Sequence, residues 1–411
     1  MAADEILLHI KDSYYFEVPK WLWKHDHQSH SDFPDVWVKL DPGFQSWQAH
    51  EVYHRLAEDG AVGLPSEADF IHDYEHWLHE PGNHGKPITR YLTHKVDESL
   101  TSGGEALVWA ERGVEVAEEY TVADYKALPA DHQHVKWAPT KIEGYNQALS
   151  GKILIPQVFG GELRNLYQKE AGFAISKFMV IEFFVAVIIT AVFIAYARRV
   201  SQGQLPKGWF WNLIDVFITF LRKDVAKANI HHGADHFVPI IWTLFFFILG
   251  CNLFGLIPWM GSPTGSISVT VTLAVAVLFI GMAAGARTFG VVGVWLNLVP
   301  GMELPTVIAI IIKPMMFIIE LLGLLIKHAV LGIRLLANMV AGHVVLLAIM
   351  GLAVQIQTAV GVPSAVAWPV VIVILLGSVL LSCLELFVAF LQAYVFALLT
   401  ALFINSETHS H

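Results

Sequence analysis

The chain has 411 residues, of which 55% are hydrophobic and 15% are charged, and its formal net charge is −10. The charge is unevenly placed, because residues 1–170 carry 28 acidic and 15 basic side chains, whereas residues 171–411 carry 8 and 11. The two cysteines, Cys251 and Cys383, lie in apolar stretches, which argues against a disulfide scaffold and predicts reduced core cysteines. We therefore expect an acidic, His-rich extramembrane domain over residues 1–170 and a transmembrane domain over residues 171–411.

The extramembrane part is predicted to be a soluble domain, mainly helical or irregular. Seven tryptophans between Trp21 and Trp137 argue against disorder. Two groups of histidines have spacings that could bind a metal: His25, His27 and His30, and then His72, His76 and His79. Because no second set of ligands can be located for either group, we interpret these histidines as solvated and expect no metal or other cofactor.

The second part begins with three apolar stretches long enough to span a bilayer core of ~30 Å. They are Phe178–Ala197, Phe237–Ile257 and roughly Ile267–Ala286. Between the first two, Trp209–Lys227 is amphipathic and too charged to span, so it should lie in the membrane interface. The stretch Gly290–Pro305 is interrupted by glycine and proline and predicts a re-entrant or interfacial turn.

Two closing apolar tracts, Leu304–Val354 and Ala365–Phe403, are longer than one span requires. At 1.5 Å per residue the second would reach roughly 58 Å, so each tract is either steeply tilted or broken. The sequence thus predicts an all-α membrane protein with about five transmembrane helices, the last two long and tilted, plus one interfacial amphipathic helix. By the positive-inside bias, the six Lys and Arg residues of positions 198–236 lie on the cytoplasmic or matrix side.

The first long tract carries four charged residues spaced seven apart: Lys313, Glu320, Lys327 and Arg334. On an ideal helix they lie within roughly 60° of one another and form one stripe. A charge at bilayer depth costs about 3 kcal/mol, so the stripe should face protein, water or a partner's charge. Snorkelling to the interface is the alternative for each single cation. Asn338 follows Arg334 by one turn, where its amide could steady the guanidinium.

A second polar group is predicted between the two long tracts. On an ideal helix His343 is rotated about 180° from Arg334, so it faces another element. Glu385 is the only acid in the final apolar tract, and Gln392 follows on nearly the same face. His343 and Glu385 could form a proton-relay pair between the two helices. The alternative is a neutral core histidine beside a carboxylate whose hydrogen bonds are satisfied.

The run Arg334-Leu-Leu-Ala-Asn-Met-Val-Ala-Gly-His343 resembles the arginine-containing signature of subunit a of F-type ATP synthases, the membrane stator of a rotary proton motor. The likeness covers about residues 171–405, and its supporting stretches are Asn252–Pro258, Pro263-Thr264, Phe317–Glu320 and Leu391–Phe396. The sequence departs from the family at His328, where a proline is common, and at Lys313, which adds a charge.

The resemblance implies a role for each polar residue of the long tracts. Arg334 would face the ring of c subunits and separate two aqueous half-channels. Glu320, Asn338 and Gln392 would lie along the proton path, and His343 with Glu385 would be the family's Glu/His pair.

The resemblance also implies partners and a location. The chain would have no catalytic site of its own and would couple proton flow to ring rotation and ATP synthesis. It would assemble with c-ring proteolipids, b-type peripheral stalk subunits and the rest of the synthase, in contact with the lipid bilayer and protons and without nucleic acid. An N-terminus without a visible targeting segment favours a multi-pass protein of the bacterial inner (plasma) membrane over the mitochondrial inner membrane.

The alternative function is a stand-alone ion channel or transporter with a charged gating helix. Voltage sensors repeat charges of one sign, whereas this stripe mixes signs, and the internal repeat of many transporters is not found. The sequence leaves proton against sodium coupling open, because the coupling-ion ligands would lie largely on the partner ring.

Overall fold

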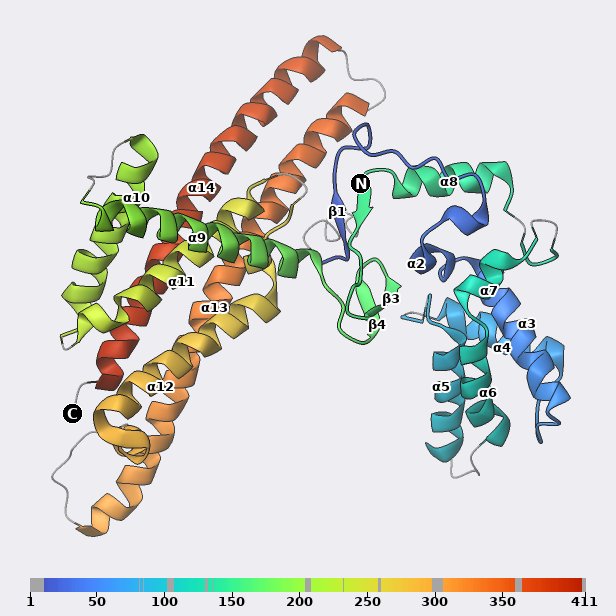
Figure 1. Ribbon diagram of the computed structural model, residues 1–411, viewed down its shortest axis with the longest axis horizontal. Helices are drawn as coiled ribbons and strands as arrows, with labels where there is room; N and C mark the ends of the chain where they lie inside the picture. Colours follow the sequence, from blue (N-terminus) through green and yellow to red (C-terminus); the bar gives the residue numbers. More distant parts are fainter. Residues whose placement is uncertain are drawn as a thin grey trace. The chain divides into compact units, whose positions relative to one another are not determined.

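The computed structural model divides the chain into two compact units, one formed by Ser13–Lys177 and the other containing Phe178–His411 (Figure 1). The residues that it describes are 11–80, 82–83, 85–101, 107–129, 132–135, 137–203, 208–231, 233–257, 260–297, 306–358 and 364–408. We call the first the extramembrane unit, after the placement expected from the sequence, and the second the membrane unit. The boundary at residue 177 lies seven residues beyond the one expected from the sequence.

The extramembrane unit is mostly helical. Its helices are α2 (Asp35–Val38), α3 (Pro42–Glu58), α4 (Glu67–His79), α5 (Ile88–Thr101), α6 (Val108–Glu119), α7 (Val122–Ala127) and α8 (Pro139–Leu149), with a 3-10 turn at His30–Asp32. The sequence did not predict its two small antiparallel sheets, which pair β1 (Tyr15–Glu17) with β2 (Lys152–Leu154) and β3 (Glu162–Asn165) with β4 (Gln168–Ala171). The β1–β2 pairing joins segments far apart in the sequence, which local patterns do not reveal.

Aromatic side chains form the interior of this unit. One core lies among helices α3 to α6, where Leu56, Phe70 and Leu92 are fully buried. A second core gathers around Phe33 and Tyr125. These buried rings confirm that the tryptophan-rich region is folded, since burial of aromatic surface stabilises a domain strongly.

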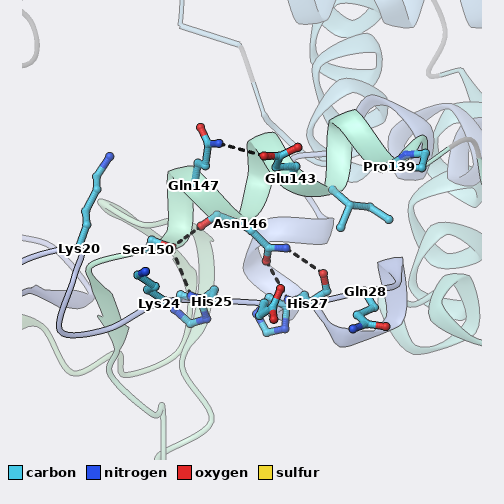
Figure 2. Close-up of a pocket in the computed structure, with 12 residues that line it drawn as sticks. Lys20, Lys24, His25, His27, Gln28, Pro139, Glu143, Asn146, Gln147 and Ser150 are labelled. Carbon is cyan, nitrogen blue, oxygen red and sulfur yellow. Dashed lines mark hydrogen bonds between the residues drawn. The ribbon is translucent and has the colours of Figure 1, made fainter.

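The segment that precedes the 3-10 turn is held along α8 (Figure 2). Asn146 binds the backbone of His27 twice, because its Oδ1 accepts from the His27 N–H at 3.0 Å and its Nδ2 donates to the His27 carbonyl at 2.8 Å. The His25 ring lies 3.2 Å from the Lys152 carbonyl oxygen. His25, His27 and Asn146 are among the residues that line a cavity of about 750 Å³.

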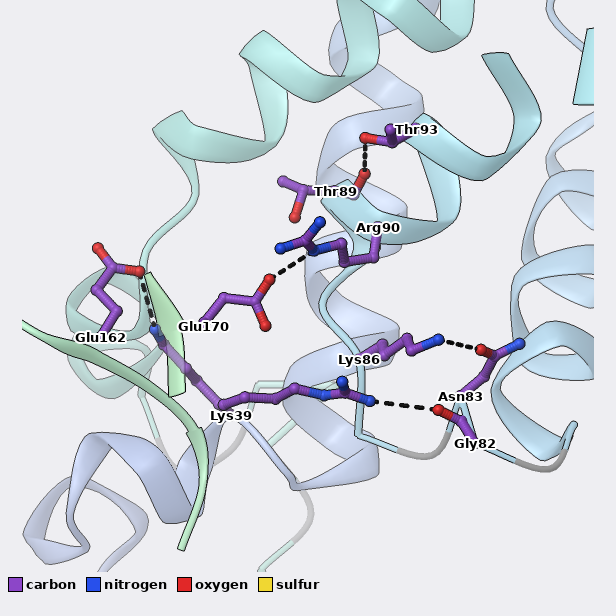
Figure 3. A network of polar contacts seen from close by, with 10 residues as sticks. Lys39, Gly82, Asn83, Lys86, Thr89, Arg90, Thr93, Glu162 and Glu170 are labelled. Carbon is purple, nitrogen blue, oxygen red and sulfur yellow. Dashed lines mark hydrogen bonds and ion pairs between the residues drawn. The ribbon is translucent and has the colours of Figure 1, made fainter. Parts of the chain in front are cut away.

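The β3–β4 hairpin is tied to the helices by charged side chains (Figure 3). Arg90 Nε donates to Glu170 Oε1 at 2.6 Å, and Lys39 Nζ lies 3.9 Å from Glu162 Oε2. Such surface pairs contribute up to about 1 kcal/mol each, so they orient the hairpin more than they stabilise it.

Among the described residues of the membrane unit, five helices are long and apolar enough to cross a membrane, which agrees with the predicted number. They are α9 (Lys177–Ser201), α11 (Ala234–Gly255), α12 (Ile267–Asn297), α13 (Thr306–Thr358) and α14 (Ser364–Thr408). The predicted amphipathic segment is α10 (Trp209–Phe220) followed by a π-helical continuation, η2 (Leu221–Lys227), and a 3-10 turn, η3 (Pro263–Gly265), precedes α12.

The two closing helices are unbroken. Helix α13 has 53 residues and α14 has 45, so the broken alternative is wrong and each exceeds the length of a perpendicular span. They run side by side in Figure 1 and pack against each other. The turn expected over Gly290–Pro305 is a kink at Gly290, whose φ is 79°, after which the helix resumes to Asn297. The rest of that stretch lies outside the described residues.

The core of the membrane unit forms where η2, α11, α12, α13 and α14 meet. Val225, Ile248 and Ala397 are fully buried there. Most of the large apolar side chains at the surface of the chain also belong to this unit, as expected for helices that face lipid or partner subunits. Cys251 is a buried core cysteine as predicted, but Cys383 lies on an exposed face of α14, so that expectation was wrong for the second cysteine.

Candidate functional site

Helix α13 presents the charged stripe on the surface of the chain. Its inward face buries Leu331 and Leu335 in the core, and Gly332 lets it approach the backbone of α12 at Thr270. Arg334 is exposed on the outward side, next to Ile333, whose side chain is 57% exposed. No acid among the described residues forms an ion pair with Arg334. A guanidinium stays charged at any physiological pH, so this face carries a fixed positive charge without a described counter-charge.

In the part of the stripe that precedes Arg334, the charges partly neutralise each other within the helix. Lys327 Nζ lies 3.8 Å from Glu320 Oε1, and both side chains are about half exposed. This pair, seven residues apart, was not anticipated from the sequence. Lys313 is exposed farther toward the start of the helix. Glu320 therefore has a cation beside it, whereas Arg334, farther along the same helix, forms no ion pair with a described residue.

His343 and Glu385 meet between α13 and α14. His343 Nδ1 lies 3.7 Å from Glu385 Oε1, and the side chains are only 17% and 6% exposed. His343 Nε2 and Glu385 Oε1 are buried and form no hydrogen bond with any described residue. Buried polar atoms are normally satisfied, so these two atoms mark an unsatisfied polar site inside the contact between α13 and α14.

Gly342 makes room for this pair. A Cβ at position 342 would lie 2.7 Å from Glu385 Oε1, a distance that side-chain carbons do not adopt. The glycine next to His343 therefore allows the carboxylate to approach α13 closely.

The two amide residues of the candidate set lie near these groups. Asn338, one turn beyond Arg334, is half-buried on α13, and Gln392 is buried on α14, two turns beyond Glu385. The structure records no hydrogen bond from either amide to Arg334 within the described part of the chain.

A buried polar network holds α14 in place, and sequence reasoning missed its function. Asn252 Nδ2 donates to the Ala389 carbonyl at 3.1 Å, and Thr264 Oγ1 donates to Asn252 Oδ1 at 2.6 Å. The Ser262 hydroxyl lies 2.8 Å from that of Thr264. Ala389 is one turn from Glu385, so the network fixes the helix turn that carries the carboxylate. An asparagine inside an apolar stretch and a Pro-Thr pair were the available signals.

His328, the departure from the resemblance, is accommodated as a packed core residue. It is 4% exposed, and its Nδ1 lies 2.9 Å from the Leu324 carbonyl oxygen. Its ring packs against that of Phe403 in a tilted arrangement, with centroids 4.4 Å apart. Its placement away from the exposed stripe gives it a packing role on the inner face of α13.

Among the described residues, neither histidine group suggested as metal ligands brings three ligand atoms together. His72, His76 and His79 are exposed on α4, as expected for solvated side chains. His30 is instead buried against Tyr125 and Trp137, which corrects the interpretation of that residue as solvated. The His27 ring packs against Phe33 in a tilted arrangement, with centroids 4.7 Å apart, and burial lowers the pKa of His27.

Comparison with known proteins matches the amino-acid sequence to a protein family. The family model described as ATP synthase A chain matches residues 179–405, more than half of the chain. The chain belongs to this family. It is 34% identical to ATP synthase subunit a of Chloroherpeton thalassium over 66% of this chain and 81% of that protein. It is 40% identical to ATP synthase subunit a 2 of Chlorobaculum tepidum over 60% and 68%, and 36% identical to ATP synthase subunit a of Myxococcus xanthus over 61% and 80%.

Proposed function

We propose that this chain is the proton-translocating stator subunit of an F-type ATP synthase, and that Arg334 is its contact with the rotor. The observation that carries the proposal is an exposed guanidinium on the outward face of a helix in the membrane unit, without an ion pair among the described residues. In a membrane such a charge is costly unless a neighbouring subunit supplies the opposite charge. A ring of c-type proteolipids bearing carboxylates meets this need.

The positive charge of Arg334 then determines where a carboxylate of the ring gives up its proton. A carboxylate on the ring can enter lipid only when it is protonated, because an ionised one is too costly there. When it reaches Arg334, the fixed positive charge favours ionisation and releases the proton. A proton is worth about 2.3 kcal/mol per 100 mV, so a leak past this point would dissipate the driving force for rotation. Arg334 thus separates the entry path from the exit path.

His343 and Glu385 supply one of the two half-channels in this proposal. Their 3.7 Å approach and their unsatisfied buried atoms support a relay across the α13–α14 contact. Gln392 on α14 and Asn338 on α13 extend the polar path, and Glu320 lies at another depth of the outward face. A location in a bacterial inner membrane, with c-ring and b-type stalk subunits as partners, accords with the bacterial relatives.

The test is ATP synthesis driven by a proton gradient in vesicles that contain the whole complex. We expect Arg334→Ala to abolish synthesis while the complex stays assembled, because no other described cation replaces it at that depth. Lys313→Ala, which removes another exposed cation of α13, is the matched control and should retain most of the activity. Near-normal synthesis with Arg334→Ala would refute the assignment.

The relay has a separate test. Exchanging the two identities, with His343→Glu and Glu385→His together, should retain more proton-driven synthesis than either loss alone, because both proton-exchanging groups remain at the contact. If the exchange variant lost as much synthesis as a variant lacking both side chains, the relay would be refuted. The role of Arg334 would not be affected.

A further inference from the structure

We propose that the extramembrane unit binds one divalent transition metal of the zinc class between α3 and α4. The ligands would be His50 and His54 of α3 and Glu67 of α4. One donor atom from each of these side chains lies within 4.8 Å of the other two. This is the only such group of three or more among the residues that the structure describes.

The local sequence explains why these three side chains converge. His50 and His54 are four residues apart on α3, so they project from the same face on successive turns. Glu67 is the first residue of α4, directly after the N-cap Ser66, whose side chain accepts from the Asp69 N–H. Tyr53 of α3 ties this helix to the segment just before α4, since its hydroxyl donates to the Pro65 carbonyl at 3.1 Å.

The distances fit a small metal ion after minor adjustment. Glu67 Oε1 lies 2.9 Å from His50 Nδ1 and 3.4 Å from His54 Nε2. Ligands that surround zinc tetrahedrally at about 2.0–2.2 Å are roughly 3.3–3.6 Å from one another. Side-chain rotations that move the donor atoms by about 1 Å would therefore bring the three atoms to these distances.

The chemistry of the set points to the zinc class and away from calcium or magnesium. Two imidazoles and one carboxylate are the ligands that zinc and related ions prefer, whereas calcium and magnesium require mainly oxygen. The His50 ring also contacts the His134 ring, with centroids 4.9 Å apart. The His54 side chain is 60% exposed, so the remaining coordination position would be open to water.

An ion pair without metal is the competing explanation for the same contacts. A protonated His50 beside Glu67 would need no contribution from His54, whose ring reaches toward the same carboxylate oxygen. The two explanations therefore differ in whether His54 and Glu67 contribute to binding an added metal.

Binding would close the loop between the two helices. Residues 59–66 connect α3 to α4 and include Gly60 and Gly63, both with positive φ. A metal held by both helices would restrain this connection and stabilise the folded unit, since the ligand set is assembled only when both helices are packed.

The experiment uses the full purified chain in detergent after removal of metals with EDTA. Cobalt(II) is titrated as the probe, with visible absorption reporting tetrahedral coordination, and zinc is then added in competition. We expect one equivalent to bind. His54→Ala and Glu67→Gln should each weaken cobalt binding by about 100-fold, because each removes a direct ligand. His76→Ala, which removes an exposed histidine of α4 outside the group, should leave binding unchanged.

A variant that gains an absorption band distinguishes loss of a ligand from loss of folding. His54→Cys should retain stoichiometric cobalt binding and add a thiolate-to-cobalt absorption band that is absent from the native chain, because a thiolate replaces the imidazole as ligand. The proposal is overturned if the native chain shows no stoichiometric tetrahedral cobalt signal, if His76→Ala weakens binding as much as His54→Ala, or if His54→Cys gives no new band. None of these measurements depends on proton transport.

Discussion

Two buried polar sites lie one turn apart on α14 and are built in opposite ways. At Ala389 the helix carbonyl, Asn252, Thr264 and Ser262 form a chain of hydrogen bonds. At Glu385 a carboxylate oxygen is buried with His343 3.7 Å away and no hydrogen bond to a described residue. A satisfied network stabilises a packed core, whereas an unsatisfied pair costs stability and is retained where its proton chemistry is needed. The first site should therefore govern folding and the second should govern transport.

The largest expected effect comes from Glu385→Gln. The amide keeps the size of the side chain but cannot exchange a proton, so proton-driven ATP synthesis in vesicles should fall at least about tenfold. Unfolding of the purified chain should change little or shift to higher temperature, because a buried carboxylate has been removed. Unchanged synthesis would contradict the assignment of this site to transport.

Asn252→Ala should have the reverse effect. It removes two buried hydrogen bonds and leaves the Ala389 carbonyl and the Thr264 hydroxyl without this partner, which should destabilise the chain by about 2 kcal/mol. Thermal unfolding in detergent measures the loss. The control is Asn338→Ala on α13, which should change stability by less than about 0.5 kcal/mol. Equal losses from the two substitutions would mean that the network has no special structural role.

Gly342→Ala should disturb the unsatisfied site while both of its ionisable residues, His343 and Glu385, are retained. The added methyl would lie 2.7 Å from Glu385 Oε1 and would push the carboxylate away from His343. We expect a several-fold loss of synthesis with a small change in stability. Gly323→Ala is the matched control in the same helix, because nothing lies within 4 Å of its added Cβ. If both variants behave alike, the close approach at Gly342 is not functional.

The smallest expected effect extends the contrast to the extramembrane unit. Asn146 satisfies the backbone of His27, but His27 Nε2 is buried without a hydrogen bond to a described residue. Burial, and then the neighbouring His25, lower the pKa of His27. Its neutral form is therefore favoured in the folded state, so stability is present above about pH 6.5 and is lost as pH falls below that value. The unfolding temperature of the unit should decline with acidification.

His27→Gln should make this decline shallower, because the variant lacks the titrating ring. His76→Gln, at an exposed position, is the control and should retain the full pH dependence. A decline of equal slope in the native chain and in His27→Gln would assign the pH dependence to other groups.

The membrane unit could be anticipated from the sequence further than the extramembrane unit could. Arg334 and its companions share a face because their spacing follows the helical repeat, which is visible without coordinates. His343 and Glu385 stand out in the sequence because they are polar residues in apolar tracts. Their contact could be anticipated because both tracts predict long helices that can pack against each other. The Lys327–Glu320 contact depends on side-chain rotamers, which spacing does not determine.

Non-local packing limited the predictions for the extramembrane unit. His50 and His54 meet Glu67 because Tyr53 and the core residue Phe70 fix α3 against α4. The spacing of histidines along the chain favoured other groups, of which His30 proved to be buried. The β1–β2 sheet joins Tyr15 to Leu154, a pairing that no local pattern encodes.

The central claim is that the outward face of α13 at Arg334 meets a partner subunit in the assembled complex. A photoreactive amino acid placed at position 333, beside Arg334, tests it directly, with position 183 on α9 as the control, since Phe183 is 67% exposed. After irradiation of intact membranes, we expect position 333 to cross-link to a small proteolipid and position 183 not to do so. Cross-linking of position 333 to lipid alone would contradict the account.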